Sequence, residues 1–277
     1  MKYITPYITP HTSGYLSPKN TGIGNALFQI ATCYGIAHKY NINVIFNNVY
    51  IYCNILNDRF NFKHKDTILR NIYNLYNNDI IFNNTIYEAP DKYMTTDKQL
   101  IEAITCTDKN SIIWGYLEST QYFKGISLFL IDLFQPDEKS YSLINIKYGH
   151  IFNNTSMTPV SLHFRGNESI LLGHYIDYTY YQEAIKYILN NTQNPIFFIF
   201  TDDYNRIDIS IFDNIKYISV SNEYDYLDLW TMSMCKHNIN SHSTFSWWGA
   251  FLNKNPDKIV LYNKKYKREM NDMFTPI

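Results

Sequence analysis

The most informative part of the chain is residues 226–253, which read YLDLWTMSMCKHNINSHSTFSWWGAFLN. Apolar side chains recur at helical spacing in its first third, and this pattern predicts a helix packed along one side. A short strand is predicted at residues 238–240. A second helix follows, because Trp247, Trp248 and Phe251 repeat along one apolar face. The stretch therefore has the helix–strand–helix order of an α/β protein.

Three hydroxyl side chains, Ser243, Thr244 and Ser246, stand at the start of this second helix. A side-chain oxygen at such a place commonly accepts from the free backbone N–H groups of the first turn, which contributes about 1 kcal/mol. The same helix start also favours a phosphate, because its unpaired N–H donors lie at the positive end of the helix dipole. The residues alone leave both roles open.

The composition limits the class of protein. A chain of 277 residues with 45% hydrophobic content can bury a sizeable core, and we expect two compact halves. The 24 basic and 25 acidic side chains nearly cancel, which argues against a nucleic-acid footprint or an anionic membrane surface as partner. The four cysteines lack metal spacing, and no apolar run approaches the roughly 20 residues of a membrane span. We expect a soluble, cytoplasmic protein, and the oligomeric state stays open.

A glycine loop opens the first clear helix, which is predicted within residues 21–40. Gly22 and Gly24 form a tight turn, Asn25 is a candidate cap, and apolar residues then repeat at i, i+3, i+4 and i+7. The loop does not read GxGxxG, and no acidic residue follows at the usual spacing, so a dinucleotide site is excluded here. A strand at residues 44–46 completes a βαβ-like unit.

The remaining elements follow from apolar patterning. In the first half we predict further strands at residues 3–8 and 112–117, whereas residues 50–110 give no readable pattern. A linker is predicted at residues 136–159. In the second half we predict strands at residues 160–164, 196–200, 215–220 and 258–262, and a helix at residues 180–189. This alternation implies a parallel sheet with helices on both faces.

One edge of this predicted sheet gathers polar side chains, and ligands bind beyond the carboxyl ends of such strands. His163 and Arg165 end the first strand of the second half, and Asp202 and Asp203 follow the next. Arg165 suits a diphosphate because its planar fork makes two charge-assisted hydrogen bonds. A carboxylate can accept from a guanine N–H edge. Each residue also has an ordinary role open to it: a surface charge for Arg165, a core position for His163, and a turn cap for the Asp pair.

Five motifs occur in one order along the chain. They are GxGNxLFQ at residues 22–29, GYLESTQYF at 115–123, SLHFRGNE at 161–168, FTDD at 200–203, and DLWTMSMCKHNINSHSTFSWWGAFLN at 228–253. Together they resemble glycosyltransferase family 11, the α-1,2-fucosyltransferases. The similarity covers most of the chain, and the last motif is the most specific.

The resemblance implies a fold, a reaction and a domain organisation. The fold would be α/β and GT-B-like, with two Rossmann-like domains and the cleft between them. Residues 1–150 would form the acceptor-side domain, and residues 151–277 the nucleotide-sugar-binding domain. The reaction would be an inverting transfer from GDP-fucose to the 2-hydroxyl of a galactose-type glycan, with neither a metal nor another cofactor.

The resemblance also assigns roles to individual residues. Arg165 would bind the diphosphate and stabilise its growing charge as the leaving group departs. The expected guanine contacts are His163 and one of Asp202 and Asp203. The expected β-phosphate contacts are Ser243, Thr244 and Ser246, and the loop bordering the cleft would be Gly22, Gly24 and Asn25. Glu168 is our candidate for the general base, because it lies in the same loop as Arg165.

The chain departs from the family pattern near these sites. Gly166 stands where the family has a second Arg, Glu168 stands where it has Asp, and His242 stands where it has Asn. One positive charge near the expected diphosphate site is therefore missing. Two alternatives stay open: a glycosyltransferase of the same fold with another nucleotide-sugar donor, and an inactive member that binds only glycans or a partner.

Overall fold

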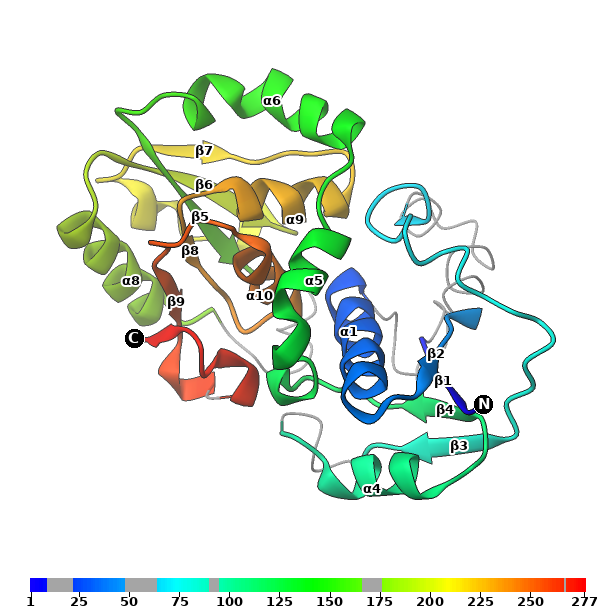
Figure 1. Ribbon diagram of the computed structural model, residues 1–277. Helices are drawn as coiled ribbons and strands as arrows, with labels where there is room; N and C mark the ends of the chain where they lie inside the picture. The colour runs from blue at the N-terminus through cyan, green and yellow to red at the C-terminus, as the bar shows by residue number, and fades with distance from the viewer. Residues whose placement is uncertain (9–21, 48–63, 90–94, 166–175, 267) are drawn as a thin grey trace. The chain divides into compact units, whose positions relative to one another are not determined.

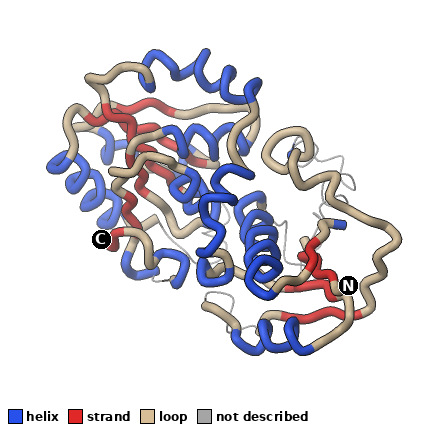
Figure 2. The backbone as a smooth tube through the Cα atoms, in the orientation of Figure 1, coloured by secondary structure: helices blue, strands red, loops and turns tan. Residues whose placement is uncertain are grey.

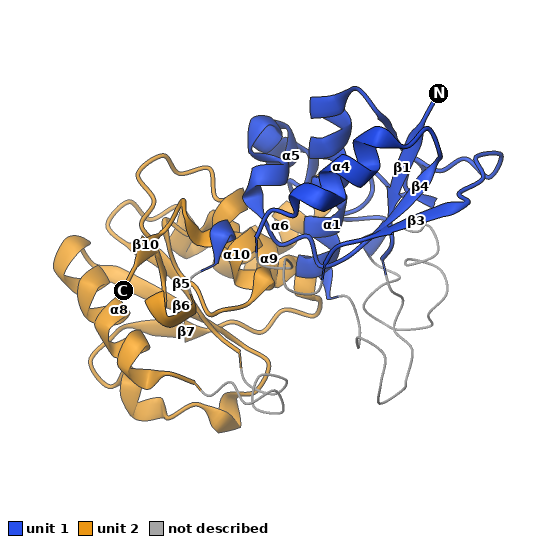
Figure 3. Cartoon of the chain, turned by 90° about the horizontal axis from the view of Figure 1, so that it is seen from below, with its two compact units in different colours: residues 1–135, 268–270 blue, residues 136–267, 271–277 orange. Residues whose placement is uncertain are grey.

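A computed structural model describes residues 1–8, 22–47, 64–89, 95–165, 176–266 and 268–277. The chain forms two compact units, which Figure 3 distinguishes by colour. Unit 1 comprises Met1–Gln135 and Arg268–Met270, and unit 2 comprises Pro136–Lys267 and Asn271–Ile277. Each unit carries its own parallel sheet, so the predicted α/β class is confirmed.

Unit 1 is built on a four-stranded sheet in the order β2-β1-β4-β3. Its strands are β1 (Tyr3–Pro6), β2 (Asn43–Val44), β3 (Asn84–Tyr87) and β4 (Ser111–Trp114). Its helices are α1 (Ile23–Tyr40), α4 (Lys98–Cys106) and α5 (Ser127–Leu133), with the 3-10 turns η1 (Thr120–Tyr122) and η2 (Lys124–Ile126). Every strand pair is parallel, so α1 and α4 serve as the crossovers between paired strands (Figures 1 and 2).

Unit 2 carries a six-stranded sheet in the order β10-β9-β8-β5-β6-β7, and all its strand pairs are parallel. Its strands are β5 (Thr158–Phe164), β6 (Pro195–Thr201), β7 (Tyr217–Ser219), β8 (His237–Ile239), β9 (Val260–Tyr262) and β10 (Thr275–Pro276). Its helices are α6 (Glu138–Phe152), α8 (Tyr178–Asn191), α9 (Asp225–Met234) and α10 (Thr244–Leu252). The 3-10 turns are η3 (Tyr204–Arg206), η4 (Ile209–Phe212) and η5 (Lys264–Tyr266). A further 3-10 turn, η6 (Glu269–Asn271), has its first two residues in unit 1 and its last in unit 2.

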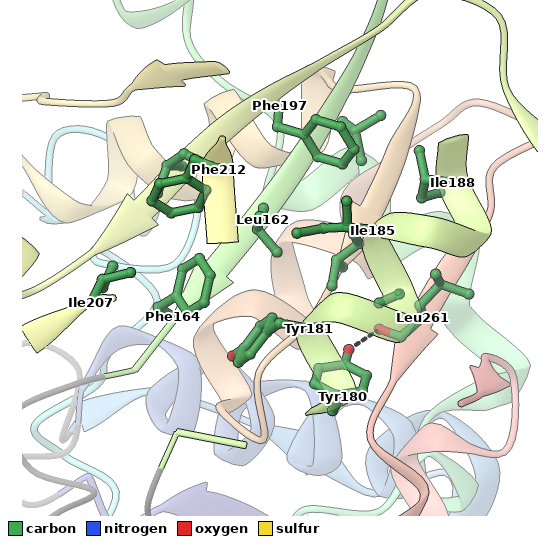
Figure 4. Close-up of a cluster of buried hydrophobic side chains, with 14 residues drawn as sticks. Leu162, Phe164, Tyr180, Tyr181, Ile185, Ile188, Phe197, Ile207, Phe212 and Leu261 are labelled. Atoms are coloured by element: carbon green, nitrogen blue, oxygen red, sulfur yellow. Dashed lines mark hydrogen bonds between the residues drawn. The ribbon is translucent and has the colours of Figure 1, made fainter. Parts of the chain in front are cut away.

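The central strand β5 separates the two faces of the unit 2 sheet. Val160, Leu162 and Phe164 point into a buried cluster against α8 (Figure 4), because alternate residues of a strand face the same side. Ser161 and His163 face the other side, where α9 and α10 pack (Figure 1). One face is thus mainly apolar, with the Tyr180 and Tyr181 hydroxyls hydrogen-bonded to backbone carbonyl oxygens, and the other carries polar side chains toward the edge.

Most predicted elements are confirmed, but the linker at residues 136–159 is wrong. Most of these residues, 138–152, form α6, whose start is capped by the Asp137 carboxylate accepting from the Ser140 N–H at 2.9 Å. The polar residues on either side of this helix read as loop in the sequence. The two units divide after Gln135, so α6 groups with unit 2 and the expected boundary at residue 150 falls inside it.

None of the helices in the described ranges is both long enough and apolar enough to cross a bilayer. The unreadable segment at residues 50–110 contains β3 and α4 in its described part. Asp97 caps α4 by accepting from two N–H groups, those of Gln99 and Leu100, at 2.9 and 3.0 Å.

The close packing of α1 against the turn after β4 is testable at Gly35. A Cβ here would lie 2.2 Å from the Tyr122 carbonyl oxygen and 2.7 Å from the Phe123 Cα. Backbone atoms cannot rotate away, so we expect Gly35→Ala to lower the free energy of unfolding by about 3 kcal/mol, despite its better helix propensity. Urea denaturation measures this change.

Gly149→Ala in α6 is the matched control. Its nearest neighbour would be the flexible Asn145 side chain at 3.3 Å, so stability should stay equal or rise by up to about 1 kcal/mol. Equal effects of the two substitutions would contradict the close approach at Gly35.

Candidate functional site

The candidate site lies at the carboxyl-end edge of the unit 2 sheet. The parallel register pairs Leu162 of β5 with Ile239 of β8, and Phe164 with Thr201 of β6. The residues that follow these three strands are therefore neighbours at one edge. Arg165 directly follows β5, as the sequence predicts.

Ser241 organises the turn between β8 and α10. Its hydroxyl lies 2.8 Å from Nδ1 of His163 and accepts from the Ser243 N–H at 3.2 Å. It also lies 3.3 Å from the Ser246 hydroxyl. One buried hydroxyl thus connects the end of β5 with the first turn of α10.

Arg165 and the start of α10 meet at Ser243. The Arg165 guanidinium donates from Nη1 to the Ser243 hydroxyl oxygen at 2.9 Å. The same oxygen accepts from the Phe245 N–H at 3.2 Å, so Ser243 is the N-cap of α10 and the capping role is confirmed for this residue. Ser246 donates to the Ser243 carbonyl oxygen at 3.2 Å, and Thr244 is buried as the first helical residue. A guanidinium is thereby held at the positive end of a helix dipole, where an anion would be stabilised.

His163 is neutral at physiological pH. Its side chain is only 8% exposed, and burial, helped by the nearby Arg165 and His242, lowers the pKa of the imidazole to about 3. Its ring packs against Phe245 at 5.8 Å between centroids, and its carbonyl oxygen accepts from the Tyr181 hydroxyl at 2.8 Å. The residue combines a core position with a polar contact at the edge.

A pocket opens beside these groups within unit 2. It is lined by Arg165, Ile176, Asp177, Tyr180, Tyr181, Ser241, His242, Asn263 and Tyr266. The rings of His242 and Tyr266 stack at 4.9 Å, with 27° between their planes. This lining brings a guanidinium, a hydroxyl and a stacked ring pair close together.

Asp177 supplies the carboxylate of this pocket. Its oxygen accepts from Lys265 at 2.7 Å and from the Asn263 amide at 3.1 Å, and these partners hold the pKa of the carboxyl below its usual range. It also caps α8 by accepting from the Tyr180 N–H. Asp177 is therefore a fixed negative group beside Arg165.

Asp202 and Asp203 follow β6, but their roles differ. Asp203 caps η3 through the Asn205 N–H at 3.0 Å and forms an ion pair with Arg206 at 3.1 Å, so the turn-cap role is the one observed. Asp202 is exposed at the same strand end. Neither lines the pocket beside Arg165.

The other predicted site residues either do not line this pocket or fall outside the described residues. Glu168 falls in the latter group. Gly22 and Gly24 are in unit 1, where Gly22 is the N-cap of α1 and Gly24 is helical. The expectation that Asn25 caps this helix is wrong, because α1 already begins at Ile23. Among the described residues no three His, Cys, Asp or Glu side chains are grouped to hold a metal ion.

Several lining residues were missed in the sequence. In the sequence, Tyr180 and Tyr181 belong only to a predicted helix. In the structure their hydroxyls also form hydrogen bonds to backbone carbonyl oxygens at the edge of the sheet. The Tyr180 hydroxyl donates to the Asn240 carbonyl oxygen at 2.6 Å. Of the missed residues, Ser241 is the one that the sequence could have indicated, because it lies only two residues before the predicted site residue Ser243.

Comparisons with solved structures define the fold class. Fucosyltransferase NodZ from Bradyrhizobium matches with a TM-score of 0.52 and 11% identity, covering 91% of this chain and 92% of that one. An Arabidopsis thaliana FUT1 mutant matches with a TM-score of 0.54 and 9% identity, covering 94% of this chain and 70% of that one. The chain therefore has the GT-B-like fold of these glycosyltransferases.

Sequence comparisons narrow the class to a family. Residues 164–274 match the profile of glycosyl transferase family 11. The Escherichia coli O-antigen biosynthesis glycosyltransferase WbnK is 27% identical, with 88% of this chain and 92% of the relative covered. An Escherichia coli alpha-1,2-colitosyltransferase is 25% identical, with 92% and 93% covered. These matches confirm the resemblance to glycosyltransferase family 11.

The capping role of Ser243 predicts a stability change. Ser243→Ala removes the acceptor of the Phe245 N–H and of Arg165, so we expect the free energy of unfolding to fall by about 1 kcal/mol. Ser233→Ala is the control, since that hydroxyl only donates back to the Trp230 carbonyl oxygen inside α9. A loss in the control as large as that in Ser243→Ala would argue against a capping contribution.

Burial of His163 predicts an acid-dependent loss of stability. The folded-state pKa, about 3, lies below the ordinary 6.5, so the contribution is present above pH 6.5 and is lost as pH falls toward 3. His237, with a pKa lowered to about 4 by burial, acts in the same direction. Between pH 6 and pH 4 we expect the free energy of unfolding to fall more steeply in the wild type than in His163→Gln. The difference between the two slopes should be about 1.4 kcal/mol per pH unit. Denaturant titrations across this range measure the slope, and equal slopes for the wild type and His163→Gln would contradict this contribution.

Proposed function

We propose that the protein is an inverting glycosyltransferase that transfers fucose from GDP-fucose to the 2-hydroxyl of a galactose-type acceptor glycan. The observation that carries the proposal is Arg165, which is held at the N-terminus of α10 beside a pocket. Support also comes from the fold, since a NodZ α-1,6-fucosyltransferase was soaked with GDP-fucose and the Arabidopsis FUT1 mutant was solved with GDP.

The proposed chemistry follows from the charge that develops during transfer. The acceptor oxygen attacks the anomeric carbon while the bond to the diphosphate breaks, and negative charge grows on the departing GDP. Arg165 and the N-terminal N–H groups of α10 would stabilise that charge without rearranging. We therefore expect this site to use fixed protein charge, with no metal required. Retention of activity in excess EDTA would agree with this.

The remaining sequence assignments complete the proposal. Ser243, Thr244 and Ser246 would surround the β-phosphate, with their hydroxyls exchanging internal partners for phosphate oxygens. His163 and one of Asp202 and Asp203 would contact guanine, and Glu168 would be the general base. Residues 151–277 would bind the nucleotide-sugar, and residues 1–150, with the loop of Gly22, Gly24 and Asn25, would serve the acceptor.

A second donor is a specific alternative. One relative is an alpha-1,2-colitosyltransferase, and the arginine that the family pattern has beside Arg165 is replaced by Gly166. The same site would then transfer colitose from its nucleotide-linked form. An inactive protein that binds only glycans or a partner is the third reading, and the direct test is donor binding.

Removal of the Arg165 charge tests the donor site. We expect GDP-fucose to bind the purified protein in preference to UDP- and dTDP-sugars, and Arg165→Ala to weaken its Kd by about 100-fold, as for a buried charge pair. Isothermal titration calorimetry measures both quantities. Arg70→Ala in unit 1 is the control, because that guanidinium contacts the Thr67 carbonyl oxygen in its own turn.

The binding experiment distinguishes the three alternatives, which are a GDP-fucose donor, a nucleotide-linked colitose donor and an inactive protein. Preference for nucleotide-linked colitose would keep the site and replace the donor sugar. Absence of binding by every nucleotide-sugar would leave the inactive reading. Tight GDP-fucose binding that Arg165→Ala does not weaken would show that the diphosphate lies elsewhere.

A further inference from the structure

Three aromatic side chains lie in a row across the unit 1 sheet, at the carboxyl ends of three neighbouring strands. They are Tyr7, Trp114 and Tyr87, and β4 lies between β1 and β3 (Figure 1). The parallel register pairs Tyr87 with Trp114. The Tyr7 N–H donates to the Ile113 carbonyl oxygen at 2.8 Å, so Tyr7 continues the pairing of β1 with β4 beyond Pro6. Paired residues of neighbouring strands point to the same side, so the three rings share one face of the sheet.

This face differs from the opposite one in exposure. Ile4, Ile86 and Ile113 point the other way along the same strands and are at most 9% exposed. Tyr87 is 64% exposed, and Trp114 is 36% exposed. Parallel sheets are normally covered on both faces, and a group of large exposed rings marks a surface that binds something.

The rings border an open hollow on this face, which we call the unit 1 hollow. Its lining residues are Tyr7, Thr85, Tyr87, Ile112 and Trp114. Thr85 pairs with Ile112, and both lie two residues before the paired rings, so they continue the same face behind them. The rings of Tyr87 and Trp114 are 5.4 Å apart between centroids, with 59° between their planes. The hollow is built from unit 1 alone.

The lining of the unit 1 hollow is uncharged and carries polar tips. None of its five residues is acidic or basic, so the lining does not favour an ion. Within the described part of the chain, no hydrogen bond is made by the hydroxyls of Tyr7, Thr85 and Tyr87 or by the indole N–H of Trp114. Aromatic faces beside available hydroxyl and N–H groups suit a neutral ligand that has C–H groups on one face and hydroxyls at its rim.

We propose that the unit 1 hollow is a carbohydrate-binding site for a neutral, galactose-type glycan. The C–H face of a sugar ring packs on Tyr87 and Trp114, and its hydroxyls exchange hydrogen bonds with Thr85 and Tyr7. Neighbouring strands lie about 4.8 Å apart, so the row of three rings is about 10 Å long and extends beyond one sugar ring. The choice of a galactose-type sugar rests on the proposed function. The site itself rests on unit 1 and takes no part in the transfer step.

A protein partner is the competing occupant, because exposed Tyr and Trp are also enriched at protein interfaces. Five residues line the unit 1 hollow, whereas a standard interface takes about 20–30 residues from each side. The small, hydroxyl-bearing hollow therefore favours a sugar over a protein.

Tryptophan fluorescence reports selectively on this site. The chain has four tryptophans, and three of them, Trp230, Trp247 and Trp248, are at most 1% exposed. A dissolved quencher such as acrylamide therefore acts mainly on Trp114. We expect lactose, added without any nucleotide, to protect this fluorescence from acrylamide in a saturable manner. Mannitol, an open-chain polyol with no ring to pack on the aromatic faces, is the control and should give no saturable protection.

Two substitutions test the contacts without removing the fluorescent ring. Tyr87→Ala truncates a largely exposed side chain, and we expect the Kd for lactose to rise at least fivefold. Thr85→Val removes a hydroxyl at nearly constant shape, and we expect a rise of about threefold. Tyr141→Ala, a half-exposed tyrosine on α6 of unit 2, is the matched control and should leave this Kd unchanged. All three variants should bind GDP-fucose as the wild type does, within twofold.

The outcomes separate this site from the proposed function. Absence of saturable protection by lactose, or protection that Tyr87→Ala leaves unchanged, would overturn the site. A dimer that Tyr87→Ala dissociates, measured by analytical ultracentrifugation, would assign the rings to a protein interface instead. Lactose binding in a protein that binds no nucleotide-sugar would contradict the proposed function and keep the site, and GDP-fucose binding without lactose protection would do the reverse.

Discussion

The parallel pairing of β5 with β6 and β8 is the constraint on which unit 2 depends. It fixes which residues meet at the carboxyl-end edge, because Leu162 lies opposite Ile239 and Phe164 lies opposite Thr201. The alternation of side chains along β5 then sends Phe164 into the apolar cluster and His163 to the polar face. The geometry of the candidate site is therefore a consequence of register, with loops supplying only the final residues.

Buried amides make this arrangement rigid. The Asn238 side chain of β8 donates to Ser161 of β5 at 2.7 Å, and its oxygen accepts from Asn253, which ends α10, at 2.9 Å. Such satisfied networks fix a unique packing, because a shift of either helix or strand would leave polar groups unpaired. Helix α10 is consequently held at both ends, by Ser243 at its start and by Asn253 at its end. A preorganised helix terminus of this kind can stabilise charge without moving.

The sequence predicts the second half well because its strands are short, apolar and separated by clear turns. Residues 160–164 and 196–200 correspond closely to β5 and β6, and the edge residues His163 and Arg165 follow at once. Sequence patterning could not decide between a cap and a ligand for Ser243 or Asp203, since both roles use the same residue types at the same places. Only the contacts of their oxygens distinguish them.

The misses have physical causes too. α6 is bounded by polar residues that resemble a linker, and β3 and α4 lie in a segment without readable periodicity. Nothing local marks Leu117 as a residue with positive φ. Contacts between residues that are far apart in the sequence are set by the folded chain. Local sequence patterns therefore predict the strands but not the residues that each strand contacts.

The short segment Arg268–Met270 has a consequence for the order in which the chain is completed. It belongs to unit 1, although the residues on either side of it belong to unit 2. Arg268 neutralises the buried carboxylate of Glu118, and Glu269 holds Ser119 and Thr96. During synthesis on the ribosome, the N-terminal sheet is made first, but it lacks this compensating cation until residue 268 has been added. The first unit can therefore be completed only after nearly all of the residues of unit 2 have been made, because residues 268–270 follow them in the sequence.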